Sequence, residues 1–379
     1  MSNAIREVVC GYVENIKPKL ENIVLALYGR PEPSGMEEKS SLLLMNVLEE
    51  EGFEIDYPVC EIPYSFKASY GTSGPTVGYV CEYDAIPGIG HGCGHNLSSA
   101  INIGAAIGLK RAISEIGGRI VVVGCPAEED TPTKINMYKE GVFSGLSALL
   151  CGHAWSDTHE SGSSYGMRVM DFTFHGKPAH TSINPQEGNN PLYPCVLTLR
   201  LCDIVKTRYS SDIFINTKIH DTPSPINLIP ESYSCSIMVK GKDSSTINEV
   251  MGKVIDCARF SAEIYSCVLE VFTQLPEYKP LKTHNSLSRI ACHNLKERGL
   301  LEINPPEVSM VSLDIGCVSQ EIPTVHLYIG ICRDKEVPYY SMEFSECTIK
   351  RYALDIMLKA ACALALTGVD IIQKPEILE

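Results

Sequence analysis

Residues 76–124 read TVGYVCEYDAIPGIGHGCGHNLSSAINIGAAIGLKRAISEIGGRIVVVG, and this stretch decides the fold. It begins and ends with short apolar runs, Thr76 to Cys81 and Arg119 to Gly124, and a long helical pattern from Leu97 to Ile116 separates them. A third apolar run, Ala148 to Cys151, follows. The pattern predicts an α/β fold in which strands and helices alternate around a buried, mainly parallel sheet.

Helical patterns also occur near both ends of the chain. Apolar residues recur at three-to-four spacing from Ile5 to Leu27 and from Glu37 to Glu51, which predicts two opening helices. A long apolar stretch from Cys347 to Leu366 predicts a final helix. These helices are expected to cover the sheet.

The middle of the chain has a different pattern. Alternating strands at Val169–Phe174 and Tyr233–Val239 occur with helical patterns at 191–209 and 245–262, typical of a smaller α+β domain with an antiparallel sheet. We therefore expect a discontinuous catalytic domain, residues 1–166 and 276–379, interrupted by a domain at residues 167–275.

Composition restricts the class of protein. The chain has 379 residues and a net charge of −14, which disfavours the broad basic surface that nucleic acids require. No secretory signal or membrane-spanning run is visible, so we expect a cytoplasmic protein without a membrane partner. The 16 cysteines are scattered through apolar runs, which predicts mostly buried free thiols.

The segment His91-Gly92-Cys93-Gly94-His95 has the composition of a metal site. Its glycines allow a tight turn, and thiolate and imidazole groups suit zinc or a similar transition metal. The alternative is a glycine-rich turn with a buried cysteine and a hydrogen-bonded histidine.

Further candidate ligands follow the predicted strands. Glu128 and Glu129 come after the second strand, and His153 follows the third with Gly152. The carboxyl ends of parallel strands meet at one sheet edge, where a cation would compensate the adjacent carboxylates. For Glu128-Glu129 alone, the alternative is a solvated acidic loop.

Several motifs together resemble a known family, the metal-dependent aminoacylase and carboxypeptidase superfamily, also called metallopeptidase family M20. The similarity is to the amidohydrolase branch that contains p-aminobenzoyl-glutamate hydrolase and beta-alanyl-lysine dipeptidase. The matching stretches cover nearly the whole chain and are Arg30-Pro31-Glu32-Pro33, Glu82-Tyr83-Asp84-Ala85-Ile86-Pro87-Gly88, Gly92-Cys93-Gly94-His95-Asn96, Pro126-Ala127-Glu128-Glu129, Gly176-Lys177-Pro178-Ala179-His180 and Asn227-Leu228-Ile229-Pro230.

The resemblance implies hydrolysis of an amide bond in a small N-acyl amino acid, dipeptide or aryl-amide. Glu128 would be the general base for a metal-activated water, and Asp84 would hold a ligating imidazole in its tautomer. One or two divalent transition ions per chain, zinc, manganese or cobalt, are implied. The implied metal ligands are Cys93, His95, Glu129 and His153.

The resemblance also assigns roles within the inserted domain, which in the family is a lid and dimerisation domain. It implies a homodimer in which His180 polarises the scissile carbonyl at the partner's active site, with Asn227 as a substrate-binding residue. A surface histidine is the alternative for His180. Lys240 stands where the family usually has a carboxylate-binding arginine, and lysine offers only a point charge.

A second departure affects the metal site. Tyr340 occupies the place of a late histidine that completes the second metal position in the family, and a phenol is a poor replacement ligand. An alternative function follows, namely a family descendant with an incomplete metal site that binds a ligand, or runs a different amide reaction, without hydrolysis. Thiol chemistry at Cys93 is a third hypothesis.

Overall fold

The computed structural model describes residues 2–209, 211–220, 224–333 and 337–379. Its contacts divide the chain into two compact units. Unit 1 comprises Met1–Ser163, Lys282–Val308 and Cys317–Glu379, and unit 2 comprises Ser164–Leu281 and Ser309–Gly316. Each unit has a hydrophobic core of its own.

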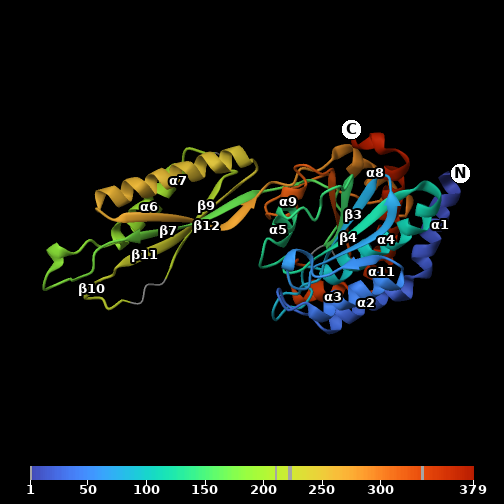
Figure 1. The fold of residues 1–379 in the computed structure, drawn as a ribbon, viewed down its shortest axis with the longest axis horizontal. Helices are drawn as coiled ribbons and strands as arrows, with labels where there is room; N and C mark the ends of the chain where they lie inside the picture. The colour runs from blue at the N-terminus through green and yellow to red at the C-terminus, as the bar shows by residue number, and fades with distance from the viewer. Residues whose placement is uncertain (1, 210, 221–223, 334–336) are drawn as a thin grey trace. The chain divides into compact units, whose positions relative to one another are not determined.

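Unit 1 is built on a six-stranded sheet of order β1-β2-β4-β3-β5-β14, in which β3, β4, β5 and β14 run parallel (Figure 1). The α/β class with a mainly parallel sheet is thus confirmed. Its strands are β1 (Glu54–Asp56), β2 (Phe66–Ser73), β3 (Thr76–Glu82), β4 (Gly118–Cys125), β5 (Ala148–Trp155) and β14 (Thr324–Gly330). Its helices are α1 (Ser2–Asn15), α2 (Lys17–Gly29), α3 (Glu38–Glu50), α4 (His95–Ile116), α5 (Thr133–Lys139), α8 (Asn285–Glu297), α10 (Met342–Cys347) and α11 (Arg351–Gln373), with short 3₁₀ turns at Val59–Glu61 and Pro375–Leu378.

Helix α4 lies at the centre of unit 1. It packs against β3 and β5, against α11, and against α1 and α2. Most of its side chains are buried, because other elements cover the helix on all sides. A helix in this position is apolar around its whole circumference. A helix that starts at the sheet edge and runs through the core gives its first residues a fixed position.

Two helix predictions need correction. The stretch from Ile5 to Leu27 forms two helices rather than one, because Pro18 lies in the first turn of α2 and cannot continue the hydrogen bonds of α1. The final helix begins at Arg351 rather than Cys347, and Cys347 closes the separate helix α10.

Unit 2 has a four-stranded antiparallel sheet of order β12-β7-β11-β9. Helices α6 and α7 pack on this sheet and enclose the second core. Its elements are β7 (Gly166–His175), β8 (Ala179–His180), a 3₁₀ turn at Pro185–Glu187, α6 (Leu192–Lys206), β9 (Phe214–Ile219), β10 (Leu228–Ile229), β11 (Ser232–Gly241), α7 (Ser244–Ile264) and β12 (Val268–Tyr278). Three short elements contain the residues at which the chain passes from one unit to the other. They are β6 (Ser163–Ser164), β13 (Val308–Ser309) and α9 (Ile315–Val318).

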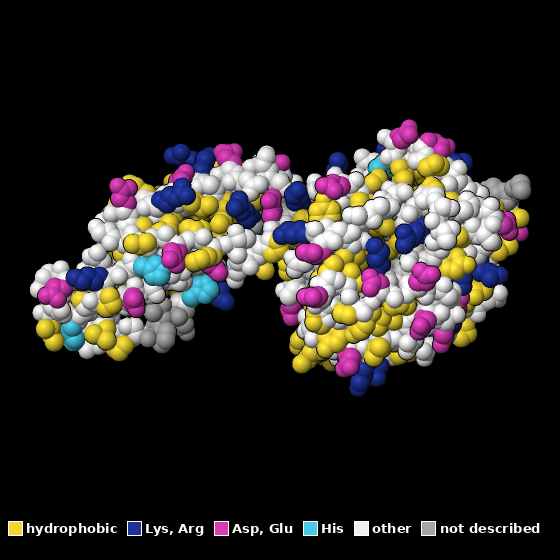
Figure 2. All heavy atoms as spheres, in the orientation of Figure 1, with side chains coloured by type: hydrophobic (Ala, Val, Ile, Leu, Met, Phe, Trp, Pro, Cys, Tyr) yellow, Lys and Arg dark blue, Asp and Glu magenta, His cyan; other side chains and the backbone are white. Residues whose placement is uncertain are grey.

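The surface charges and the state of the cysteines are those expected from the composition. Basic and acidic side chains are interspersed on the face drawn in Figure 2. All 16 cysteines are free thiols and most are buried, as expected. Among the helices of the described residues, none is both long and apolar enough to cross a bilayer.

Candidate metal centre

The candidate residues of unit 1 meet at one edge of its sheet. Glu82 is the last residue of β3, Glu128 and Glu129 lie in the turn after β4, and His153 belongs to β5. Since these strands are parallel neighbours, their carboxyl ends lie side by side. His153 lies within β5 rather than after it, because the pairing with β14 continues to Trp155.

Gly94 fixes the start of α4. Its φ is +82°, in the left-handed region that favours glycine, and a Cβ here would lie 2.6 Å from the Ala154 Cβ. No other residue fits this position without moving β5. Gly94 therefore holds His95, the first residue of the helix, close to the strand that carries His153.

Asp84 orients the His95 ring. Its Oδ1 lies 2.9 Å from the His95 Nδ1, and its Oδ2 accepts hydrogen bonds from the Ser34 hydroxyl at 2.8 Å and the Glu129 N–H at 3.0 Å. Burial raises the pKa of the Asp84 carboxyl, but the charge of His95 and these hydrogen bonds bring it below its ordinary value. Burial lowers the pKa of His95, but the neighbouring Cys93 and Asp84 groups raise it well above its ordinary value. The Asp84 carboxylate faces the Nδ1 side of the ring and so turns the Nε2 toward the site.

The Nε2 of His95 faces three carboxylates. It lies 3.6 Å from the Glu82 Oε2, 3.8 Å from the Glu128 Oε2 and 4.0 Å from the Glu129 Oε1. Both this nitrogen, on a side chain that is 1% exposed, and the Glu129 Oε1 are buried without a hydrogen-bond partner. Such unsatisfied atoms among carboxylates fit a bound cation.

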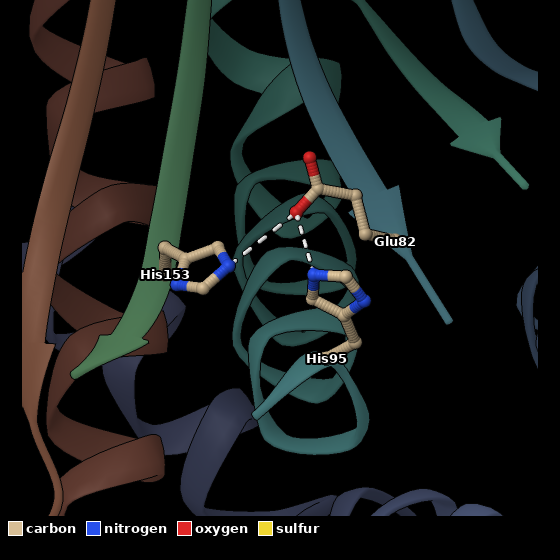
Figure 3. Close-up of side chains that lie close together, drawn as sticks. All are labelled: Glu82, His95 and His153. Atoms are coloured by element: carbon tan, nitrogen blue, oxygen red, sulfur yellow. Dashed lines mark ion pairs between the residues drawn. The ribbon is translucent and has the colours of Figure 1, made fainter. Parts of the chain in front are cut away.

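Among the residues that the structure describes, two sets of side chains could hold a metal ion, and both contain His95. One set is Cys93, His95 and Glu129, and the other is Glu82, His95 and His153; within each set the donor atoms lie within 4.8 Å of one another. Figure 3 shows the Glu82 carboxylate pointing toward both imidazole rings of the second set. Transition metals bind such donors.

His153 also turns its Nε2 toward the site, 3.7 Å from the Glu82 Oε2. Its Nδ1 lies 2.9 Å from the Ala154 carbonyl oxygen, which can accept a hydrogen bond from it. Burial lowers the pKa of His153 to about 3, so its imidazole is neutral, which is the form that coordinates metals. The Nε2 of His153 then carries a lone pair.

The turn that carries Glu128 and Glu129 is held from the N-terminal part of the chain. Ala127 has a φ of +54°, and its N–H donates to the Glu37 Oε1 at 2.6 Å. Glu37 is fully buried, and burial raises the pKa of its carboxyl. Sequence patterns give no role to Glu37, because an acidic residue before a helix usually lies at the surface.

Tyr340 lies beside Glu129. Its hydroxyl donates a hydrogen bond to the Glu129 Oε2, and burial raises the Tyr340 pKa above its ordinary value. A neutral phenol that donates to a carboxylate competes with a metal for that oxygen. The tyrosine at position 340, where the family resemblance implies a histidine, therefore contacts Glu129, one of the candidate ligands.

Cys93 is buried against the same site. Burial raises the pKa of its thiol to about 12, so the thiolate needs a cation nearby. A buried thiol with a raised pKa is a poor nucleophile, so thiol chemistry at Cys93 is disfavoured. Its Sγ contacts the Asp84 carbonyl oxygen at 3.9 Å.

A buried ion pair lies next to this site. The Lys134 Nζ is 2.8 Å from the Glu82 Oε1, and the two side chains are 1% and 6% exposed. Glu82 belongs to a motif of the family resemblance that gives it no role, and no sequence motif includes Lys134. The only sequence signal for Lys134 is its place in the mixed stretch Thr133 to Met137.

The three predicted residues of the inserted domain lie in unit 2. The pairing of β8 with β10 places the Asn227 amide nitrogen 3.4 Å from the His180 Nε2. Lys240 lies in β11 opposite Met167 and Phe214, and burial lowers the pKa of its half-buried ammonium. His180 and Asn227 are thus adjacent, whereas Lys240 belongs to the central sheet of the unit.

Comparisons with known proteins agree with the fold and the motifs. A search of protein-family models found no match. The chain is 26% identical over 390 residues to the Xaa-Arg dipeptidase of Homo sapiens, covering 97% of this chain and 88% of that protein. It is 30% identical over 201 residues to one of the p-aminobenzoyl-glutamate hydrolase subunits of Escherichia coli, covering 48% of this chain and 42% of that protein.

One solved structure with a similar fold is described as a member of the M20 family. The YXEP protein of Bacillus subtilis, described as a dinuclear metal binding peptidase from the M20 family, matches with a TM-score of 0.69 at 18% identity and covers 94% of this chain and 99% of that chain. The sequence relatives and the shared fold agree with each other. Both comparisons support the resemblance of this chain to the M20 amidohydrolase branch of metal-dependent hydrolases.

Proposed function

We propose that this enzyme hydrolyses the amide bond of a small dipeptide or N-acyl amino acid with a divalent transition ion. The observation that carries the proposal is the buried His95 Nε2, which lacks a hydrogen-bond partner and faces three carboxylates. The names of the dipeptidase and p-aminobenzoyl-glutamate hydrolase relatives support the substrate class. The proposed ligands are Cys93, His95, Glu129 and His153, and the proposed ions are zinc, manganese or cobalt.

The chain's own groups have distinct roles in this proposal. When bound, the ion acts as a Lewis acid toward the carbonyl and lowers the pKa of water. Glu128, whose Oε2 lies 3.8 Å from the His95 Nε2, takes the proton from the attacking water and returns it to the leaving amine. Asp84 holds His95 and, through the Glu129 N–H, the turn that carries both glutamates.

His180 is proposed to polarise the scissile carbonyl. The Ser182 N–H donates to the His180 Nδ1 at 3.2 Å, so the neutral ring carries its proton on Nε2. An Nε2–H can donate to a developing oxyanion, and the neighbouring Asn227 amide can bind the same substrate.

The proposal includes a cytoplasmic homodimer formed through the inserted domain. Unit 2 exposes large apolar side chains, among them Ile183, Ile226 and Phe260. The family resemblance, rather than a contact in this structure, supplies the idea that His180 acts at the partner's site.

Replacing His180 by Ala should lower kcat by about 10²–10³-fold, the usual effect of losing one oxyanion donor, while metal content stays unchanged. His220→Ala is the matched control, because His220 is another partly exposed histidine of unit 2. Steady-state kinetics and elemental analysis of both variants test the role. Equal losses in the two variants, or loss of metal in His180→Ala, would contradict it.

A substrate screen tests the function itself. The purified chain is loaded with zinc, manganese or cobalt and incubated with dipeptides ending in Arg or Lys, beta-alanyl dipeptides and N-acyl amino acids. We expect amine release from at least one class, and its loss when a chelator removes the ion. An ion-loaded chain that cleaves none of them would instead support the non-hydrolytic descendant, for which the Tyr340 departure is the motivation.

A further inference from the structure

We propose that Cys10 and Cys362 form a redox-active thiol pair, which a small carboxylate-bearing disulfide such as cystine, bound in the cleft that Cys362 lines, oxidises to a protein disulfide. None of the residues involved belongs to the candidate metal centre. The inference does not depend on the proposed hydrolase function.

The two thiols lie in contact between helices α1 and α11. They share a hydrogen bond, and the Cys362 Sγ also lies 3.8 Å from the Cys10 carbonyl oxygen. The two helices pack against each other, and the cysteine side chains are 4% and 3% exposed. Contact between two cysteine side chains is the first requirement of a disulfide.

A cleft opens at Cys362. Its volume is about 550 Å³, and side chains of α1, α2, α8 and α11 line it. Sites for small molecules usually measure about 300–1,000 Å³. A small disulfide can therefore enter the cleft and reach the Cys362 sulfur, although most of that side chain is covered by protein.

Two cations of the cleft are available to a ligand. Within residues 2–209, 211–220, 224–333 and 337–379, neither Arg298 nor Lys359 takes part in an ion pair. The Arg298 Nε is buried without a hydrogen-bond partner. Since buried polar groups are normally paired, and a guanidinium binds carboxylates well, these two side chains favour a carboxylate ligand.

The other charges of the cleft leave this preference intact. Lys17 is paired with Asp355 at 3.3 Å, and Glu297 is paired with Arg6 at 2.9 Å. The remaining acidic residue of the lining is the exposed Glu14. It can bind the ammonium group of an amino-acid disulfide, so the cleft offers charges of both signs to a molecule of the cystine type.

The surroundings also favour the reactive form of the thiol pair. The hydrogen bond from Cys362 lowers the pKa of the Cys10 thiol to about 7; burial opposes this, and the charges of Arg298 and Arg6 lower the pKa further. The thiolate is the form that attacks a disulfide. At neutral pH this pair therefore loses a proton more readily than an isolated buried cysteine does.

The exchange needs no other redox partner. Cys362 passes its proton to the Cys10 thiolate and attacks one sulfur of the bound disulfide, whose S–S bond breaks. The first small thiolate leaves and takes that proton from Cys10. Cys10 then attacks the Cys362 sulfur of the mixed disulfide, and the second small thiolate leaves and takes a proton from water. Two protein thiols are thus oxidised to one disulfide, while one small disulfide is reduced to two thiols.

Unit 2 supplies a matched control within the same chain. Cys195 and Cys235 also share a hydrogen bond, but both side chains are fully buried in the apolar core of that unit. Contact between thiols is therefore common to the two pairs, whereas the charged cleft is a feature of the Cys10 pair. Only the Cys10 pair should react with a small disulfide while the protein is folded.

Non-reducing gel electrophoresis of the full chain tests the proposal. The reduced protein is incubated with dithiodipropionate, a dicarboxylate disulfide, and in parallel with the neutral hydroxyethyl disulfide; remaining thiols are then alkylated. A bond between Cys10 and Cys362 closes a loop over nearly the whole chain, so the denatured oxidised protein should migrate faster than the reduced one. Mass spectrometry of proteolytic peptides identifies the joined cysteines.

Three variants accompany the unaltered chain, and circular dichroism establishes that each is folded. Cys362→Ser removes one thiol of the pair. Lys359→Gln removes a cation of the cleft, and Lys296→Gln removes an exposed lysine of α8 outside the lining as its control.

We expect a fast-migrating species in which Cys10 is joined to Cys362, its absence in Cys362→Ser, and unreacted thiols at Cys195 and Cys235. Lys359→Gln should slow the reaction with dithiodipropionate about two- to fivefold, the usual effect of one partly exposed charge pair. It should leave the rate with hydroxyethyl disulfide unchanged, and Lys296→Gln should alter neither rate.

Two kinds of result would overturn the proposal. If the unaltered chain gives no Cys10–Cys362 peptide, or if the Cys195 pair is oxidised equally fast, the cleft does not select a reactive thiol pair. If Lys359→Gln changes the two rates equally, or neither of them, the cleft does not recognise a carboxylate.

Discussion

Glu128→Gln should lower kcat by about 10²–10⁴-fold, the range typical of a lost general acid–base group. The substitution keeps the shape of the side chain and removes only its ability to accept and return a proton. Glu128 is suited to this role because its Oε2 lies 3.8 Å from the His95 Nε2 without belonging to either candidate ligand set. Metal content should therefore remain that of the unaltered chain.

The matched control for this experiment is Asp130→Asn. Asp130 is an exposed acidic residue two positions further along the same turn, and the same loss of one charge there should leave kcat within about twofold of the unaltered value. Steady-state kinetics with saturating metal gives both numbers. A fall of less than tenfold in Glu128→Gln, or an equal fall in the control, would remove Glu128 from the mechanism.

Lys134→Met should lower the free energy of unfolding by about 3–5 kcal/mol in the presence of a chelator, because it leaves the buried Glu82 without its cation. Urea unfolding followed by circular dichroism measures the change. Added transition metal should restore stability, since an ion at about 1,000 times its Kd contributes roughly 4 kcal/mol to the state that binds it.

Two further variants separate this effect from simple loss of a lysine. Lys139→Met removes an exposed lysine of the same helix, α5, and should change stability by less than about 0.5 kcal/mol. The combined Glu82→Gln and Lys134→Met variant removes both charges and should be more stable than Lys134→Met alone. The opposite order of stability would show that Lys134 acts through packing rather than charge.

The sequence was sufficient to predict the class of fold and the sheet edge at which the candidate residues meet. Apolar strands with Val and Ile runs are local patterns, and the rule that parallel strands bring their carboxyl ends together placed Glu128, Glu129 and His153 at one edge. Element ends were less accurate: Pro18 was not recognised as the start of a new helix, and β5 continues past Cys151 to Trp155.

The details of the site depend on contacts that no local pattern records. Whether Lys134 points into the core or into solvent depends on how the short helix α5 packs, and only the structure shows it beside Glu82. The anchoring of Ala127 by Glu37 joins residues 90 positions apart. Tyr340 could be recognised as a departure by its motif, but its hydrogen bond to Glu129 could not.

The divided layout of unit 1 has a consequence for synthesis on the ribosome. Helix α4 and the strands beside it are complete by residue 163, yet their partners β14 and α11 emerge only after the inserted segment of roughly 120 residues. At about 5–20 residues per second, that segment delays them by roughly 6–24 s. During this interval the apolar side of α4 that α11 later covers has no partner from its own chain, which makes the nascent protein a natural client for chaperones.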